Sequence, residues 1–286
     1  MKNLIKKCKL TFILFAFPLL ALSQKEIKVM SYNIRLDVAS DGENRWDARK
    51  DKVAGLMNFY EADFIGGQEV QHHQLKYLQE NLNGYSYIGV GRDDGKEAGE
   101  YSCVFYKKEK FEVLQQSTFW LSPTPDSVSK GWDAAFKRVC TYGLFKDLNS
   151  KKKFWVLNTH FDHVGLVARE ESAKLIIAKI KQLNSRKNYP VVLMGDFNSR
   201  PADAAIKYLN QSMLNARVVS KEPAYGPADT WNGFKFKEKP DGCIDYIFVS
   251  DDRRISITKF ATLTDSYDMK YPSDHMPVLA VFLLKK

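Results

Sequence analysis

Short apolar segments that end abruptly on an acid, an amide or a histidine constrain the fold of this chain more than any other feature. In VVLMGDFNSRP, residues 191–201, four apolar residues lead directly into Gly195, Asp196, Phe197 and Asn198. Residues i and i+2 of an extended chain point to the same side, so Asp196 and Asn198 should project together. Burying such groups without partners is costly, so the fold must bring them to other polar groups.

The same pattern recurs elsewhere in the chain. Besides Asp196 and Asn198, the residues that follow or flank apolar segments are Asn33, Glu69, Glu100, His160, Asp245, Asp274 and His275. One such residue would be interpreted as a hydrogen-bonded cap or turn residue, but so many in similar positions are better explained by one shared polar centre. Oxygen-rich sets of this kind suit Mg²⁺ or Mn²⁺. A hard metal ion, acids and two histidines favour hydrolysis of a phosphate ester by activated water.

Strand-like and helix-like segments are mixed along the chain but do not alternate strictly. Strands are expected over residues 26–36, 63–70, 85–91, 101–108, 111–122, 138–148, 152–162, 243–250 and 276–284, and from Val191 onward. Apolar residues at helical spacing predict helices over 45–62, 74–82 and 168–184, and a proline suited to a first turn places another near Pro201. Hairpin-like strand pairs between the helices predict mixed sheets that pack together, with helices outside.

Several other chemistries lack their motifs. No G-x-S-x-G elbow and no G-x-x-x-x-G-K-S/T loop occurs, which argues against a serine hydrolase and excludes a P-loop. After the first 23 residues the chain keeps Cys103, Cys140 and Cys243, an odd number without repeated spacing. This argues against a disulfide framework and against a zinc site. Cys103 and Cys140 lie in strand-like segments, where we expect buried thiols.

The first 23 residues have the pattern of a targeting segment. MKNLIKKCKL is basic, LTFILFAFPLLAL is apolar but short for a membrane span, and ALS supplies small residues before Gln24. This predicts a cleaved signal peptide over residues 1–23 and a secreted or periplasmic protein without stable membrane insertion; an uncleaved anchor is the alternative. Cys8 precedes the apolar run, so it is not placed for lipid attachment. Losing the four lysines of the leader lowers the formal net charge from +9 to +5, which is compatible with an anionic substrate.

The ordered series SYNIR, QE, GEYSCVFY, NTH, GDFN, IDYIF and SDH resembles the endonuclease/exonuclease/phosphatase superfamily over nearly all of residues 26–284. The resemblance implies one domain over residues 24–286. The implied fold class is α/β, a four-layer α/β sandwich of two packed mixed β-sheets flanked by helices. The implied activity is that of a hydrolase dependent on Mg²⁺ or Mn²⁺. We expect a monomer whose partner is its phosphate-ester substrate.

The resemblance also implies roles for the residues around the metal ion and the attacking water. Asn33 and Glu69 resemble the metal-binding pair, with Glu69 as the direct carboxylate ligand. Asp274 is expected to bind the metal or its water shell. Asp196 resembles the residue that orients or deprotonates the attacking water, and Asn198 would hold that water or a phosphate oxygen.

Two histidines are expected to face the phosphate. His275 resembles the histidine that is oriented by a carboxylate, here Asp245, because a carboxylate on one imidazole nitrogen fixes the tautomer and supports the charged form. His160 resembles the second histidine, with Glu100 as its expected carboxylate partner.

Weaker candidates have two interpretations each. Arg138, in KRVCTYGLF, is a candidate substrate contact or the partner in an ordinary surface ion pair. Asp162 and His163 follow NTH and are candidates to line the pocket or to be structural. Three tryptophans are candidates to stack on a base or sugar, or to pack in the interior: Trp46, Trp132 and Trp231.

The sequence does not decide which class of phosphate ester is the substrate. The positive net charge and several aromatic residues favour a polynucleotide, but the basic residues form no dense stripe. A sugar phosphate, inositol phosphate or phospholipid head group is the alternative substrate. Leu193 and the sequence DGCIDY depart from the inositol 5-phosphatase patterns. NTHFDH and VFYKK favour the deadenylase-like branch, whereas the leader argues against cytoplasmic mRNA. A catalytically inactive binding module is disfavoured because the polar set is intact.

Overall fold

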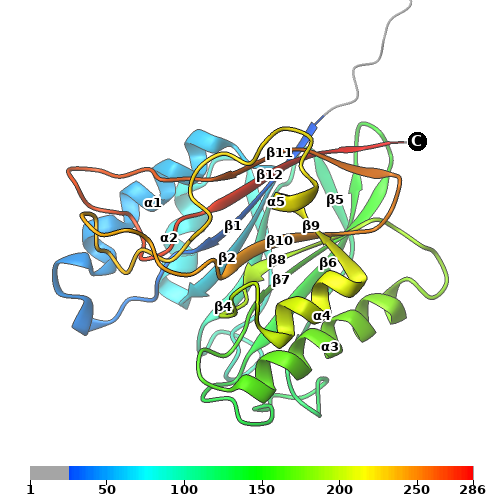
Figure 1. Ribbon diagram of the computed structural model, residues 1–286, viewed down its shortest axis with the longest axis horizontal. Helices are drawn as coiled ribbons and strands as arrows, with labels where there is room; N and C mark the ends of the chain where they lie inside the picture. Colours follow the sequence, from blue (N-terminus) through cyan, green and yellow to red (C-terminus); the bar gives the residue numbers. More distant parts are fainter. Residues whose placement is uncertain (1–25, 286) are drawn as a thin grey trace, which may run out of the picture.

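Two six-stranded β-sheets form the centre of this protein, whose computed structural model describes residues 26–285 (Figure 1). The expected leader therefore lies outside the described residues. The first sheet has the order β11-β12-β1-β2-β4-β3 and the second has the order β5-β6-β7-β8-β10-β9. The first sheet contains β1 (Glu26–Asn33), β2 (Phe64–Val70), β3 (Tyr85–Ile88), β4 (Tyr101–Lys107), β11 (Ile255–Thr262) and β12 (Val278–Leu284). The second contains β5 (Phe111–Trp120), β6 (Val139–Asp147), β7 (Lys153–His160), β8 (Val191–Asp196), β9 (Met213–Asn215) and β10 (Asp245–Ser250).

Each sheet is mixed in the same way, with a parallel pair at its centre. Strands β1 and β2 are parallel, as are β7 and β8, and the other neighbours are antiparallel. Helix α1 (Trp46–Tyr60) connects the first pair and α3 (Leu166–Leu183) connects the second, as parallel neighbours require a crossover. The carboxyl ends of the paired strands therefore lie together, and these are the ends that carry the candidate residues.

Helices cover both outer faces of the packed sheets (Figure 1). Helices α1 and α2 (His72–Asn81) pack on the first sheet, for example through Leu56 and Leu75. Helices α3 and α4 (Ala204–Ser212) pack on the second sheet, for example through Ile176 and Leu209. A third apolar cluster fills the space between the sheets, around the buried ring of Phe64. The expected four-layer sandwich is confirmed.

The expected elements differ from the observed ones mainly in short or late segments. The helix expected near Pro201 begins at Ala204, because residues 201–203 form a turn and Asp203 is the N-cap. Strand β11, the short β9, helix α5 (Ala216–Val219) and the 3₁₀ helix η1 (Ala39–Asn44) were not predicted. Cys103 and Cys140 are buried free thiols, as expected.

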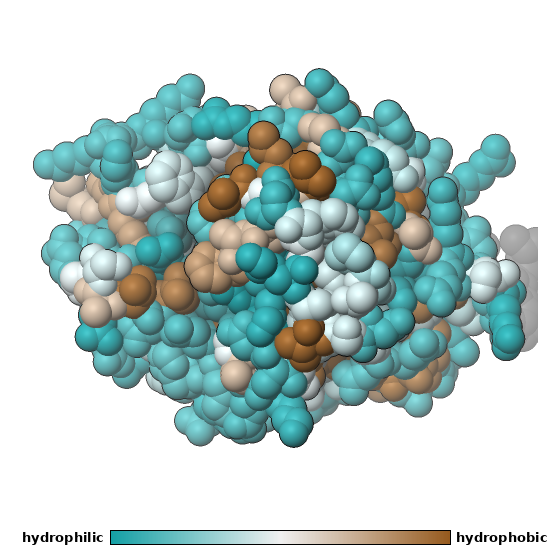
Figure 2. Space-filling view, turned by 90° about the horizontal axis from the view of Figure 1, so that it is seen from below, coloured by the Kyte–Doolittle hydropathy of each residue, from teal (hydrophilic) through white to brown (hydrophobic). Residues whose placement is uncertain are grey.

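The exterior is polar over most of the face seen from below, with small separate hydrophobic groups (Figure 2). Within residues 26–285, no helix combines the length and the apolar character that crossing a bilayer requires.

A buried amide links the two sheets directly beneath the polar strand ends. Asn158 of β7 donates hydrogen bonds to Gly67 O at 3.0 Å and to Cys103 O at 2.7 Å, both in the first sheet. Its Oδ1 accepts from Gln68 Nε2 at 2.6 Å. A Cβ on Gly66 would lie 2.7 Å from Asn158 Oδ1, so only glycine leaves room for this approach. Asn158 thus fixes how closely the two sheets pack.

We expect Asn158→Leu to destabilise the protein, because it leaves buried carbonyls of the first sheet without their donors. Each unsatisfied buried group costs about 1–3 kcal/mol, so the free energy of unfolding should fall by roughly 2–4 kcal/mol in urea denaturation. Gln116→Leu, the matched control on an exposed strand position, should change it by less than about 0.5 kcal/mol. Equal stability of the two variants would contradict a clamp at Asn158.

Candidate active site

Strand register brings the candidate residues to one end of the sandwich. His160 is opposite Asp196 in the parallel pair β7–β8, and Asp196 is opposite Asp245 in the antiparallel pair β8–β10. Asn33 is the last residue of β1. These strand ends border a cavity of about 580 Å³. The residues that line it are Arg35, Leu36, Glu69, Arg92, Glu100, Phe136, Arg138, His160, His163, Asp196, Asn198, Trp231, Ile244, Asp274 and His275.

A bulge near the end of β2 aims Glu69 into this cavity. The β2–β4 register shifts between Gly67 and Val70, and Glu69 has a φ of 59°. A non-glycine residue in the left-handed region is strained, and such strain persists where the surroundings hold it. Here the carboxylate of Glu69 accepts from Leu36 N at 3.1 Å and from Asn33 Nδ2 at 3.0 Å.

Asn33 joins acids from both sheets. Its Nδ2 donates to Glu69 Oε1 at 3.0 Å and to Asp196 Oδ2 at 2.9 Å. Its Oδ1 accepts from Arg35 N at 3.0 Å, which fixes the amide orientation. The sequence predicted that Asn33 and Glu69 lie together, and in the structure Asp196 also accepts a hydrogen bond from Asn33.

The acids outnumber the nearby cations. Arg35 Nη1 is 3.9 Å from Glu69 and 3.7 Å from Asp274. Burial and the charge of Glu69 raise the pKa of Asp274, although His275 opposes this. Burial and the charge of Asp245 raise the pKa of Asp196 to about 7. Crowded carboxylates of this kind are oxygen ligands in need of a cation.

Two groups of possible metal ligands overlap at Asp196. Ligand atoms of Glu69, His160 and Asp196 lie within 4.8 Å of one another, and so do those of Asp196, Asp245 and His275. In the second group the imidazole and Asp245 already bind each other. Glu69 of the first group, with Asp274 close by and Asp196 beside it, therefore supplies the carboxylates that fit a hard divalent cation.

His275 is held in a charged form by two carboxylates. Its Nδ1 is 2.9 Å from Asp245 Oδ2, and its Nε2 is 3.8 Å from Asp196 Oδ2. Burial opposes the charge, but Asp245 and Asp196 raise the pKa of His275 well above its usual range. Thr230 Oγ1 donates to Asp245 Oδ2 at 2.5 Å and accepts from Asp245 N. Thr230 was not predicted, because it lies in a loop with no motif of its own.

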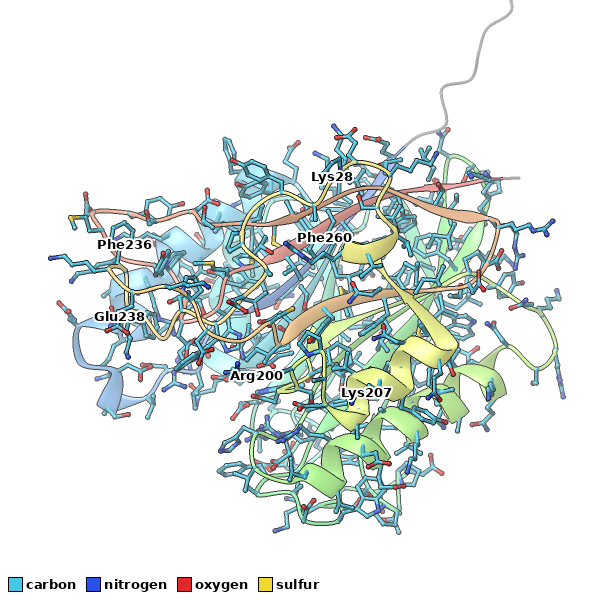
Figure 3. All side chains as sticks on the ribbon, in the orientation of Figure 1. Lys28, Arg200, Lys207, Phe236, Glu238 and Phe260 are labelled. Atoms are coloured by element: carbon cyan, nitrogen blue, oxygen red, sulfur yellow. The ribbon has the colours of Figure 1, made fainter. Side chains whose placement is uncertain are left out.

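The segment that carries Thr230 runs between α5 and β10 and extends well away from α4. Figure 3 shows this segment through Phe236 and Glu238, with Arg200 just after β8 and Lys207 on α4. The backbone of Trp231 forms an isolated antiparallel bridge with His275. The segment therefore positions both the hydroxyl behind Asp245 and one aromatic wall of the cavity.

His160 is held by different neighbours and is neutral. Arg138 Nη1 lies 2.9 Å from Nδ1, and because arginine only donates, Nδ1 must accept and Nε2 must carry the proton. The protonated Nε2 faces Asp196 Oδ2 at 3.4 Å, and because it cannot accept, the neighbouring Asn198 Nδ2 donates to Phe161 O at 3.0 Å. Burial and the charges of Arg138 and Arg92 hold the pKa of His160 well below its usual range.

Glu100 is not the direct partner that was expected for His160. Its carboxylate forms a two-bond pair with Arg92, at 2.7 and 2.8 Å, and lies 3.8 Å from His160 Nδ1. Arg138 occupies the closer position. The sequence contains nothing that assigns Arg92 to Glu100, because the two meet only when the loop between them folds back.

Arg138 is buried and holds three side chains of the site in place, so it does not belong to an ordinary surface ion pair. Besides His160, it contacts Asp162 through Nε at 3.3 Å and His163 Nδ1 through Nη2 at 3.2 Å. His163 lines the cavity, and its ring stacks on Phe136 at 5.8 Å between centroids.

Asp162 is not among the residues that line the cavity, so the structural one of its two interpretations applies. Its carboxylate accepts from four backbone N–H groups, those of Ala135, Phe136, Val164 and Gly165. Burial opposes its charge, but these hydrogen bonds hold the pKa of Asp162 well below its usual range. Asp162 therefore anchors the loops on which Arg138 and His163 depend.

The three tryptophans separate by position. Trp46 is buried and packs with α2, Trp132 is half-buried, and Trp231 is partly exposed and lines the cavity. Of the three, only Trp231 is placed to contact a substrate in the cavity.

Comparison with known proteins agrees with this geometry. The profile of the "Endonuclease/Exonuclease/phosphatase family" matches residues 30–275. The chain belongs to this family. Its members include phosphoesterases that depend on a metal ion, and the acidic cluster around Asp196 fits that property. The chain is thus a hydrolase of phosphate esters, and the resemblance read from its motifs is confirmed.

Three relatives illustrate the range of the family. A solved family protein from Bacteroides vulgatus is 39% identical, with a TM-score of 0.85, over 92% of this chain and 100% of that one. A mannosyl-6-phosphatase from Bacteroides thetaiotaomicron is 37% identical, with a TM-score of 0.87, over 90% and 100%. The CCR4-Not complex 3'-5'-exoribonuclease subunit Ccr4 from Candida albicans is 25% identical over 85% of this chain but only 38% of its own length. This chain therefore spans less than half of that exoribonuclease subunit.

We expect Arg138→Lys to lower kcat by about 10- to 100-fold while folding is kept, because a lysine cannot hold three partners and small displacements of catalytic groups are costly. Initial rates and circular dichroism on the same sample measure this. Lys137→Ala, at the neighbouring partly exposed position, should keep the full rate. An Arg138→Lys enzyme with an unchanged rate would show that His160 needs no such support.

Proposed function

We propose that this protein is a phosphatase that removes phosphate from a sugar, with Mg²⁺ or Mn²⁺ as its metal ion. The similarity to a mannosyl-6-phosphatase over nearly the whole chain carries this proposal. The leader expected over residues 1–23 supports a substrate outside the cytoplasm, such as a glycan.

The shape of the cavity supports a small substrate. Its volume is in the range of small-molecule sites, with catalytic groups on the inner wall and aromatic side chains at the mouth. Trp231 is 36% exposed and Phe136 is 49% exposed. The Phe136 ring stacks on His163, so its exposed part and the exposed part of Trp231 are what a sugar ring can contact, while the polar groups of the cavity suit its phosphate.

Glu69 and Asp274 are the metal ligands in this proposal. Glu69 and Asp274, with Asn33 and Asp196 beside them, would hold a divalent cation, which when bound supplies positive charge opposite the phosphate oxygens. The carboxylate oxygens of Glu69 and Asp274 suit Mg²⁺ or Mn²⁺ better than a softer ion, whereas the Asn33 amide turns its nitrogen toward these acids and its oxygen toward Arg35 N.

Asp196 is the base that fits the attacking water. Burial and the charge of Asp245 raise the pKa of Asp196, which makes its carboxylate a stronger base than an ordinary aspartate. Asn198 N donates to Asp196 Oδ1 at 2.9 Å and leaves Oδ2 directed at Asn33 and the two histidines. The arrangement explains why Asp196 and Asn198 stand two residues apart: one orients the other at the end of the strand.

The two histidines contact the phosphate in different protonation states. The raised pKa of His275 favours its charged form, whose Nε2–H can neutralise a phosphate oxygen in the transition state. His160 is neutral, and its Nε2–H is a hydrogen-bond donor that does not add charge.

A nuclease is the second candidate. The similarity to Ccr4 favours it, and the exposed rings of Trp231 and Phe136 suit a base as well as a sugar. The two candidates differ in whether the reacting phosphate is a monoester or a diester.

Phosphate release from a substrate panel separates the candidates. We expect mannose 6-phosphate and p-nitrophenyl phosphate to be hydrolysed, because the similarity to a mannosyl-6-phosphatase favours a phosphomonoester, and bis-p-nitrophenyl phosphate and poly(A) to be much poorer substrates. The measurement is the initial rate of each substrate under the same conditions. Preference for the diester and poly(A) would replace the phosphatase proposal by the nuclease.

We expect activity to vanish in EDTA and to return with Mg²⁺ or Mn²⁺, because the acids need a cation to bind the phosphate.

Asp196→Asn should lower kcat by about 10²- to 10⁴-fold, since it removes the base, and excess Mn²⁺ should not restore it. Glu69→Gln should weaken metal binding, and excess Mn²⁺ should partly restore its rate. Asp47→Asn, on an exposed position, is the matched control. Activity that survives exhaustive chelation, or a fully active Asp196→Asn enzyme, would refute these roles.

A further inference from the structure

A second polar hollow adjoins the active-site cavity. It has a volume of about 340 Å³ and lies between the loop over residues 89–100 and the start of α2. Arg92 and Glu100 line both spaces, so the two hollows meet at this ion pair. None of the roles assigned above uses the other residues of the second hollow, which include His72, His73 and Glu97.

The hollow is preformed by a loop with many internal hydrogen bonds. Gly91 N donates to Lys96 O at 2.9 Å, and Asp93 N donates to Ala98 O at 3.0 Å. Asp94 Oδ1 accepts from the backbone N–H groups of residues 96 and 98. A ligand that enters this hollow therefore does not have to order the loop, and a preorganised site binds at lower entropic cost.

The shared wall offers no free positive charge that would attract a second phosphate into the hollow. The two terminal nitrogens of Arg92 are committed to the carboxylate of Glu100, so the pair is charge-balanced. Trp120 Nε1 donates to Arg92 O at 2.8 Å and fixes the base of this wall. The remaining groups are neutral or acidic, apart from histidine. The chemistry suits a neutral, hydroxyl-rich ligand better than an anion.

His72 Nε2 and the Glu97 carboxylate face each other as two hydrogen-bond acceptors, so a hydrogen-bond donor from a ligand fits between them. Tyr101 Oη donates its proton to Lys96 O at 3.0 Å, so it accepts from His72 Nδ1 at 3.1 Å. In the neutral ring this leaves Nε2 as an acceptor, and it faces Glu97 Oε2 at 3.7 Å. A hydroxyl group placed there would donate to one of these acceptors. Beside them, His73 Nε2 lies 3.3 Å from Asp37 Oδ2 and adds a second polar edge.

We propose that this second hollow binds the sugar unit next to the phosphorylated one, so that the substrate is a phosphorylated oligosaccharide and not a free sugar phosphate. This inference rests on the proposed phosphatase function. The terminal sugar and its phosphate occupy the first cavity, between Trp231 and Phe136. The glycosidic bond passes the Arg92–Glu100 pair, and hydroxyls of the next sugar meet His72 and Glu97.

The test compares kcat/KM for mannose 6-phosphate with that for a mannose disaccharide phosphorylated at C6 of its non-reducing unit, with p-nitrophenyl phosphate as a generic substrate. The wild-type protein should prefer the disaccharide by roughly three- to tenfold, the effect of one or two hydrogen bonds. Glu97→Ala and His72→Ala should remove that preference and leave the rate on mannose 6-phosphate unchanged. Lys76→Ala, exposed on the same helix, is the matched control and should keep it.

The result is read as a ratio of two substrates on one preparation, so partial loss of folded protein does not affect it. Glu97 is exposed in the loop, which keeps one variant well folded if His72→Ala is not. Equal kcat/KM for both sugars in the wild type, or a preference that survives both variants, would overturn the second sugar site. If p-nitrophenyl phosphate is hydrolysed and neither sugar phosphate is, the sugar phosphatase proposal itself is wrong, and this inference falls with it.

Discussion

Two buried amides hold the two sheets at a set distance, and the active site depends on that distance. Asn158 of the second sheet donates to carbonyls of the first sheet, in the interior. Asn33 of the first sheet donates to Glu69 and to Asp196, which belong to different sheets. Acids on two separate sheets can share one cation only if the sheets cannot slide, and buried hydrogen bonds resist sliding because breaking them leaves unsatisfied groups.

The same residue type takes opposite roles according to its neighbours. Asp245, supported by Thr230, stabilises the charged ring of His275. Arg138, anchored by Asp162, disfavours a charge on His160 and fixes its proton on the nitrogen that faces Asp196. One histidine therefore supplies charge and the other supplies a neutral donor. The carboxylate and the guanidinium behind them decide this division.

Patterns of neighbouring residues predicted most of the layers and most of the candidate site. Apolar segments of the right length and spacing predicted the main strands and helices, but short β9 and the late β11 carry weak patterns. Asp196 and Asn198 were recognised because their spacing is local. Glu100, the expected partner of His160, lies 3.8 Å from its ring but is paired with Arg92, and Arg92 and Thr230 were not predicted, because these pairings depend on how loops fold back.

By itself the sequence determined which side chains are available: acids, amides and histidines at the ends of buried strands, in the order typical of one family. Because parallel neighbouring strands end at the same edge of a sheet, strand geometry alone then brings many of these side chains together. Only the tertiary structure decided the partner of each group, the two opposite histidine environments and the second hollow beside Arg92 and Glu100. These depend on distances of a few ångströms between separate segments, and such distances follow from packing and not from order along the chain.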